Sequence, residues 1–188
     1  MKEAKCQGFC KAVYYDPNRR APVQNRLIYH VKKKENDNAL RFLAASVKDS
    51  MLGMLKEAEI DHKDVILTYL PRSKHAQLLH GTDQALALCR TLAELTNIKY
   101  QTLLCRKKGR DKEQKRLSPA ERLQNAKKSI LPLERAECRG KTVVLVDDIV
   151  TTGASLSAGV RILRRMGAVK VFCVAIATDV CNKDTAVY

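Results

Sequence analysis

Two apolar, β-branched runs near the C-terminal end of the sequence constrain the fold more than any other feature. Residues 142–146 are TVVLV and residues 169–177 are VKVFCVAIA. Apolar residues at consecutive positions are typical of strands that are buried on both faces of a sheet. The segment between them has the apolar spacing of an amphipathic helix that stops at Gly167. Its predicted buried face consists of Leu156, Val160, Leu163 and Met166. Strand, helix and strand then form a βαβ unit, which requires a parallel sheet.

The chain before this unit adds two helices and two strands to the prediction. Residues 64–70 (DVILTYL) indicate a buried strand that ends at Pro71, and residues 100–105 indicate a shorter strand. Helices are predicted from Asn36 and from Thr82, each by apolar residues at helical spacing. The residues expected to face inward are Leu40, Leu43, Ala44, Val47, Met51, Met54 and Leu55 in the first helix, and Ala85, Leu88, Leu92 and Leu95 in the second.

These elements predict an α/β fold, with an open, mostly parallel twisted sheet flanked by helices. A chain of 188 residues suits one core domain, which we place at residues 36–188. Residues 1–35 are basic and rich in turn signals, which predicts a small N-terminal extension. Cys6 and Cys10 lie in it at CxxxC spacing. Structural zinc needs four ligands, and His30 as a third would leave the site open, so we predict no metal here unless two chains share one zinc.

Charge and composition bound the compartment and the partners. The sequence has 35 Lys and Arg against 20 Asp and Glu, and a net charge of +15 attracts phosphates, nucleotides or nucleic acid. Aromatic residues make up only 5%, which disfavours a base-stacking platform. The number of cysteines, seven, is odd, and five of them lack disulfide-like spacing, so we expect reduced thiols. No signal peptide is apparent and no apolar run approaches the ~20 residues of a membrane span, so we expect a cytoplasmic protein with no membrane contact.

Residues 143–155 (VVLVDDIVTTGAS) are the segment with the clearest chemistry. Backbone amides of residues 151–155, unpaired at a helix N-terminus, can hold a phosphate dianion, and Gly153 lets that backbone approach closely. The carboxylates of Asp147 and Asp148, at the carboxyl end of the strand, can accept hydrogen bonds from vicinal hydroxyls. A ribose 5-phosphate fits both halves, whereas an ordinary strand end and helix cap is the alternative. Neither GxxxxGK[ST] nor GxGxxG occurs in the chain.

This segment resembles the signature with which type I phosphoribosyltransferases bind 5-phosphoribosyl-1-pyrophosphate (PRPP). The resemblance implies that Asp147 and Asp148 hold the ribose hydroxyls. It also implies a cradle for the 5-phosphate made of Thr151, Thr152, Gly153, Ala154 and Ser155. The expected ligands are PRPP with Mg²⁺ and a small nitrogenous acceptor, which displaces pyrophosphate. No side chain need act as a covalent nucleophile.

The resemblance also assigns cationic residues to the pyrophosphate. Residues 69–74 (YLPRSK) take the place of the pyrophosphate loop, with Arg72 and Lys74 as its charges, although a basic surface turn is an equal alternative. Residues 106–128 hold ten Lys or Arg and three Asp or Glu, which predicts a mobile basic loop and a short helix after Pro119. By resemblance, Gln114 to Asn125 belong to the flexible catalytic loop that folds over the bound ligand. Its candidate donors are Arg106, Lys107, Lys115 and Arg122, and for each of them a solvated charge is the alternative.

Within this superfamily the chain is most similar to the ComF group, which is associated with competence for DNA uptake. The similarity rests on residues 71–74 (PRSK), on residues 81–84 (GTDQ), where Thr82 replaces the usual Phe, and on a third motif. That motif consists of Gln114, Leu117, Arg122 and Asn125. Three functions stay open: a phosphoribosyltransferase, a competence factor that binds single-stranded DNA, and a PRPP-sensing regulator without turnover. Relatives often form dimers, which makes a homodimer the expected assembly.

Overall fold

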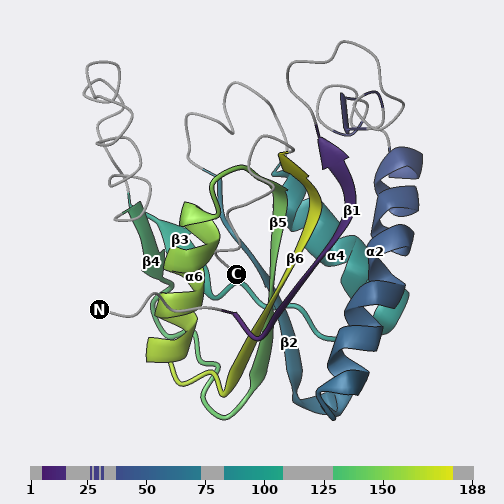
Figure 1. Cartoon of the computed structure of the whole chain (residues 1–188). Coiled ribbons are helices and arrows are strands. Elements are labelled where there is room, and N and C mark those ends of the chain that lie inside the picture. The colour runs from purple at the N-terminus through teal and green to yellow at the C-terminus, as the bar shows by residue number, and fades with distance from the viewer. Residues whose placement is uncertain are drawn as a thin grey trace, which may run out of the picture.

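A parallel sheet runs through the centre of the computed structural model (Figure 1). The structure describes residues 6–15, 26, 28, 29, 31, 37–72, 83–107 and 129–179, and within these the sheet has four strands. From one edge to the other they are β1 (Gly8–Tyr15), β6 (Lys170–Asp179), β5 (Thr142–Val150) and β2 (Val65–Tyr69). All neighbouring pairs are parallel, and Tyr100 adds a parallel bridge to Leu67 beyond β2. The predicted parallel sheet is confirmed.

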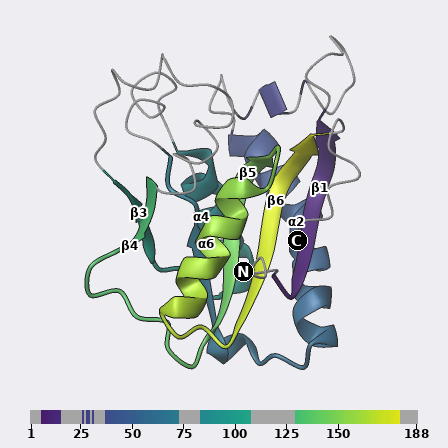
Figure 2. The ribbon, with the colours of Figure 1, turned by 60° about the vertical axis from the view of Figure 1, so that its left-hand side comes forward.

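Helices cover both faces of this sheet, as the turned view shows (Figure 2). Helices α2 (Asp37–Glu57) and α4 (Gln84–Thr96) pack on one face, and α6 (Ala154–Arg165) packs on the other. A short 3-10 turn, η1 (His62–Asp64), leads into β2. Strands β3 (Leu104–Arg106) and β4 (Ile130–Pro132) form a separate antiparallel pair next to α6. The fold is therefore α/β, with a central sheet between helical layers. No described helix has the length and apolar character that crossing a membrane requires.

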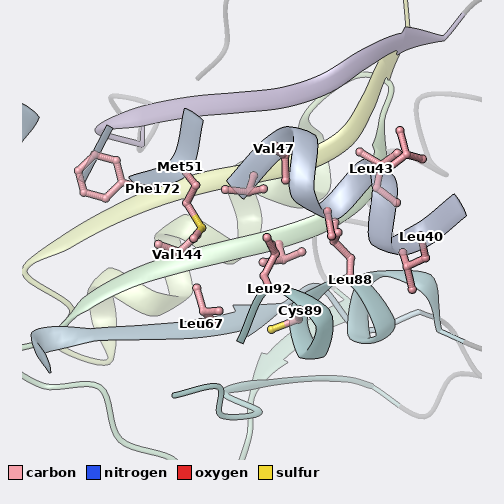
Figure 3. Packing of buried hydrophobic residues seen from close by; sticks show 14 of the residues in the cluster. Leu40, Leu43, Val47, Met51, Leu67, Leu88, Cys89, Leu92, Val144 and Phe172 are labelled. Atoms are coloured by element: carbon pink, nitrogen blue, oxygen red, sulfur yellow. The ribbon is translucent and has the colours of Figure 1, made fainter. Parts of the chain in front are cut away.

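Side chains of β5 alternate between two apolar cores. Val144 and Val146 pack with α2 and α4 in one core (Figure 3), whereas Val143 and Leu145 pack with α6 in the other. Because both faces are covered, the strand needs apolar residues at every position, which explains the continuous run in the sequence. Full burial of one aliphatic side chain contributes about 1.5–3 kcal/mol, so these contacts hold β5 firmly in the centre of the sheet.

Helices α2, α4 and α6 and strands β2, β5 and β6 agree with their predictions apart from details at their ends. Of the strand predicted at residues 100–105, only the end belongs to β3, and Tyr100 adds an isolated bridge. The mobile loop and the short helix predicted after Pro119 lie outside the described residues. Helix α4 begins at Gln84 rather than Thr82, because the Asp83 side chain accepts a hydrogen bond from the Leu86 amide and caps the helix. Leu95, predicted to face inward, is 38% exposed. It lies in the last turn of α4, at the margin of the face that packs on the sheet.

The N-terminal segment differs more from the expectation. Residues Gly8–Tyr15, which we assigned to an extension outside the core, form edge strand β1 of the main sheet. They pair with β6 in parallel, from Gly8 opposite Phe172 to Tyr15 opposite Asp179. The apolar pattern of this strand is weak because an edge strand is only partly covered by other elements. Its residues Cys10, Ala12 and Val13 are half-buried against one core. The predicted domain boundary at residue 35 stays a prediction.

The approach of α6 to β5 depends on a residue without a side chain. A Cβ atom at Gly159 would lie 2.8 Å from Cδ2 of Leu145 and 3.2 Å from Cδ2 of Leu70. Gly53 in α2 is different, since a Cβ atom there would meet no atom within 4 Å. Gly159 therefore allows the close approach of α6 to β5, whereas Gly53 only weakens the helix in which it lies.

We therefore expect Gly159→Ala and Gly53→Ala to change stability in opposite directions. Overpacking at residue 159 should outweigh the better helix propensity of alanine and lower the free energy of unfolding by about 1 kcal/mol. Gly53→Ala should raise it by about 0.5–1 kcal/mol. Urea unfolding of the two variants and the wild type measures both values. Stabilisation by Gly159→Ala would contradict the close packing of α6 on β5.

Candidate functional site

At the carboxyl edge of the sheet, an aspartate and an arginine that are far apart in the sequence form an ion pair. Strand β2 ends at Tyr69 beside β5, where the Leu70 amide donates to the Val146 carbonyl at 2.9 Å. Two residues later, Nη2 of Arg72 lies 2.5 Å from Oδ2 of Asp148. Their side chains are only 16% and 15% exposed, so the ion pair is largely shielded from water. Both residues were predicted for the site, and the structure places them in direct contact.

The turn between β5 and α6 forms a small cavity. It has a volume of about 50 Å³ and is lined by Asp147 and residues 149–156. All five residues predicted to cradle a phosphate therefore share one cavity with one of the two acids. Gly153 has φ of +69°, a left-handed conformation that glycine adopts without strain. The first turn of α6 follows directly, so amides without a partner inside the helix and the positive end of the helix dipole lie at this cavity. Of these amides, that of Ala154 donates to Oγ1 of Thr152 at 3.5 Å.

Asp147 is in an environment that disfavours its charge. Burial raises its pKa well above the ordinary value of an aspartate, and the neighbouring charge of Asp148 raises it further. Two contacts act in the other direction. The Asp148 amide donates to Oδ1 of Asp147 at 2.9 Å, and the positive charge of Arg106 also lowers the pKa. Asp147 therefore takes up a proton more readily than an exposed aspartate.

The structural role of Arg106 was not predicted from the sequence. We treated it as one of several charges of a basic loop, with a solvated side chain as the alternative. The structure places it in β3, where Nε donates to the Pro71 carbonyl at 2.6 Å and Nη1 donates to Oγ of Ser129 at 2.7 Å. Its partners are 35 and 23 residues away. Arg106 comes directly after the strand predicted at residues 100–105, and this was the one signal that its side chain starts from within the fold.

Asp83 connects the start of α4 to the same region. Its Oδ2 accepts a hydrogen bond from the Arg72 amide at 3.0 Å, while Oδ1 accepts from the Leu86 amide at 3.3 Å. Gln84, the next residue of the GTDQ motif, is buried. The structure thus shows that Asp83 of the GTDQ motif is a helix cap that also binds the segment after β2.

Other predicted site residues lie outside the described part of the chain, and their roles stay predictions. They are Ser73, Lys74, Gly81, Thr82, Gln114, Lys115, Leu117, Arg122 and Asn125. Cys6 and Cys10 are free thiols, and burial raises the pKa of Cys10 to about 12. Among the described residues, no group of three or more His, Cys, Asp or Glu side chains could hold a metal ion.

The part of the chain that contains this site is similar in sequence to known proteins. Residues 86–185 match the phosphoribosyl transferase domain family. The ribose-phosphate pyrophosphokinase of Pyrococcus furiosus is 34% identical over 91 residues, which are 48% of this chain and 27% of that protein. The adenine phosphoribosyltransferase of Mycobacterium avium is 42% identical over 38 residues, 20% of this chain and 21% of that protein. The matches thus span about a quarter of these relatives.

The chain also has likenesses among solved structures. One of a Trypanosoma cruzi hypoxanthine phosphoribosyl transferase has a TM-score of 0.47 to this chain and 16% sequence identity. It covers 76% of this chain and 66% of its own.

The raised pKa of Asp147 predicts a stability gain on neutralisation. The folded state binds this proton more tightly than the unfolded chain, so stability is greatest below the unfolded pKa and falls as pH rises towards the folded one. Asparagine keeps the Oδ1 acceptor and removes the charge. We expect Asp147→Asn to raise the melting temperature at about pH 7.5 by roughly 2–4 °C, equivalent to about 1 kcal/mol, with no gain near pH 4. Circular dichroism melts measure this difference.

Asp148→Asn is the matched control, with the opposite expected sign. It leaves the guanidinium of Arg72 without its carboxylate in a largely buried position, which should lower stability by about 1–3 kcal/mol. A loss of stability in Asp147→Asn at about pH 7.5 would show that the charged carboxylate is favourable in the fold.

Proposed function

Since the chain belongs to the phosphoribosyl transferase domain family, we propose that the site at the carboxyl edge of its sheet binds PRPP and transfers the phosphoribosyl group. The observation that carries this proposal is the cavity between β5 and α6, where residues 151–155 adjoin Asp147. About 50 Å³ is room for a few water-sized groups, which suits a single phosphate rather than a sugar or a base. The 5-phosphate would lie there, with the ribose hydroxyls at Asp147 and Asp148.

Arg72 is proposed to bind the pyrophosphate. Its guanidinium now forms an ion pair with Asp148, the same carboxylate that would accept hydrogen bonds from the ribose. A bound ribose would compete with Arg72 for that carboxylate and release the guanidinium towards the leaving group. The ion pair thus keeps both charges compensated until the ligand supplies new partners for each.

In the proposed reaction, a nitrogen of the acceptor forms a bond to C1 of the ribose. The C1–O bond to pyrophosphate breaks, its electron pair leaves with the pyrophosphate, and the acceptor nitrogen releases its proton to water. Negative charge grows on the leaving group, so cationic donors such as Arg72 stabilise the transition state more than the ground state. From the undescribed segments, Lys74, Lys115 and Arg122 are proposed to add further positive charge.

Mg²⁺ fits this site as a partner of the ligand. The described residues offer the carboxylates of Asp147 and Asp148 but no larger cluster of metal ligands. Mg²⁺ is commonly held by one or two carboxylates together with phosphate oxygens and water, which is the combination that PRPP would complete. When bound, it would neutralise charge on the pyrophosphate.

We further propose that the enzyme is of the ComF type and acts on a small nitrogenous acceptor. Support comes from residues 71–74 and 81–84, of which Arg72 and Asp83 are joined by a hydrogen bond at the site. Single-stranded DNA binding is a second candidate, favoured by the net charge of +15. A PRPP sensor without turnover would use the same site.

PRPP binding tests the proposal directly. We expect calorimetric titration with PRPP and Mg²⁺ to show saturable binding by the wild type, weakened about 10–100-fold in Asp148→Asn, which loses a charged hydrogen-bond acceptor worth ~1.5–3 kcal/mol. Asp64→Asn is the matched control because Asp64 is 63% exposed and pairs with Lys141 at the start of β5. It should bind like the wild type.

Turnover and DNA binding are separated by two further measurements. Pyrophosphate release with one of a panel of nucleobases supports the transferase, whereas binding without release supports the sensor. Salt-sensitive binding of a single-stranded oligonucleotide that survives in Asp148→Asn indicates a DNA surface separate from the PRPP site. A folded wild type that binds no PRPP would refute the proposed function.

A further inference from the structure

The peptide group between Pro71 and Arg72 is bound on both sides by charged side chains from different elements. Its carbonyl oxygen accepts a 2.6 Å hydrogen bond from Nε of Arg106 in β3. Its amide donates a 3.0 Å hydrogen bond to Oδ2 of Asp83 at the start of α4. Because a peptide group is planar, hydrogen bonds to both its carbonyl and its amide restrict how the whole plane can turn. The backbone from which the Arg72 side chain extends is therefore held in one direction.

Both side chains that hold this peptide are themselves anchored. Arg106 also donates to Oγ of Ser129, which immediately precedes β4. Asp83 also accepts from the Leu86 amide as the cap of α4. The two charges attract each other, and Asp147 adds a second negative charge close to Arg106. One network thus joins β3, the residue before β4, the start of α4 and the segment after β2.

The Pro71–Arg72 peptide group does not need charged partners to satisfy its hydrogen bonds. A water molecule or a neutral side chain can satisfy a buried carbonyl or amide. Here a largely buried guanidinium takes that place, although removing such a charge from water is unfavourable. Burial indeed lowers the pKa of Arg106, while Asp147 and Asp83 raise it. The charge is held where it influences both the peptide and the acidic edge of the sheet.

We propose that Arg106 and Asp83 are positioning residues, which orient the Pro71–Arg72 peptide so that the Arg72 guanidinium lies at Asp148. Arg106 would then affect ligand binding through Arg72 and without touching the ligand. This distinguishes it from the cationic donors of a catalytic loop, with which the sequence grouped it. The effect on PRPP rests on the proposed function, whereas the effect on the peptide does not.

The first test follows the peptide itself in the ligand-free protein. We expect Arg106→Gln to shift the ¹H and ¹⁵N resonances of the Arg72 amide, because the hydrogen bond at the other end of the same peptide group is lost. Arg106→Lys should give a smaller shift, since an ammonium can keep one donor to the Pro71 carbonyl but lacks the planar fork. Arg90→Gln, which removes an exposed arginine from α4, is the matched control and should leave this amide unchanged. An Arg72 amide that is identical in Arg106→Gln and the wild type would overturn the proposal.

The second test is a double-mutant cycle in PRPP and Mg²⁺ binding. Arg106→Gln should weaken binding about tenfold in the wild type and have little further effect in Arg72→Gln, because its influence passes through Arg72. Equal weakening in both backgrounds would mean that Arg106 meets the ligand directly, which overturns the positioning role. If Arg106→Gln does not fold, the same cycle with Arg106→Lys decides.

The two tests separate the two proposals. A wild type that binds no PRPP refutes the proposed function but leaves the resonance shift of the Arg72 amide as the deciding result for Arg106. PRPP binding by the wild type with an unchanged Arg72 amide in Arg106→Gln supports the function and refutes the positioning role.

Discussion

Strand β5 is held from both faces, by α2 and α4 on one side and by α6 on the other. Everything at the site depends on this double burial, because the strand that carries Asp147 and Asp148 cannot shift along the sheet without moving two apolar cores. The parallel arrangement then brings the end of β2 to the same edge, and with it Arg72. Close packing at Gly159 lets the middle of α6 approach Leu145 in the middle of β5.

The site concentrates charges of both signs in a position largely shielded from water. Asp148 has Arg72 as a partner, and Asp147 has the amide of Asp148 and the charge of Arg106, but burial still dominates the pKa of Asp147. The charged form of such a carboxylate lowers the stability of the folded state. This is common at functional sites, where residues serve ligand binding rather than stability. The surrounding apolar layers supply the stability that this edge of the sheet does not.

The sequence predicted those parts of the fold that depend on local periodicity. The spacing of apolar residues located α2, α4 and α6, and the continuous apolar runs located β2, β5 and β6. The turn after β5 was recognised from residue types that share one short segment. Features that depend on distant partners were not predictable in this way. Strand β1 has a weak pattern because it lies at an edge, and the role of Arg106 depends on Pro71 and Ser129, which no local pattern connects to it.

The pairing of β1 with β6 also bears on how the sheet is completed during folding. Two hydrogen bonds join Gln7 and Val171 although 164 positions separate them. Strand β1 therefore pairs only after β6, the last strand of the described residues, has been formed. Closing so long a loop is entropically unfavourable, and non-local parallel pairing is slow to form. Until β6 has formed, the backbone N–H and C=O groups of β1 lack partners and its apolar side chains are exposed. Both can lead to pairing with strands of other chains. The edge that is least visible in the sequence is thus the one at which a folding chain is most exposed to aggregation.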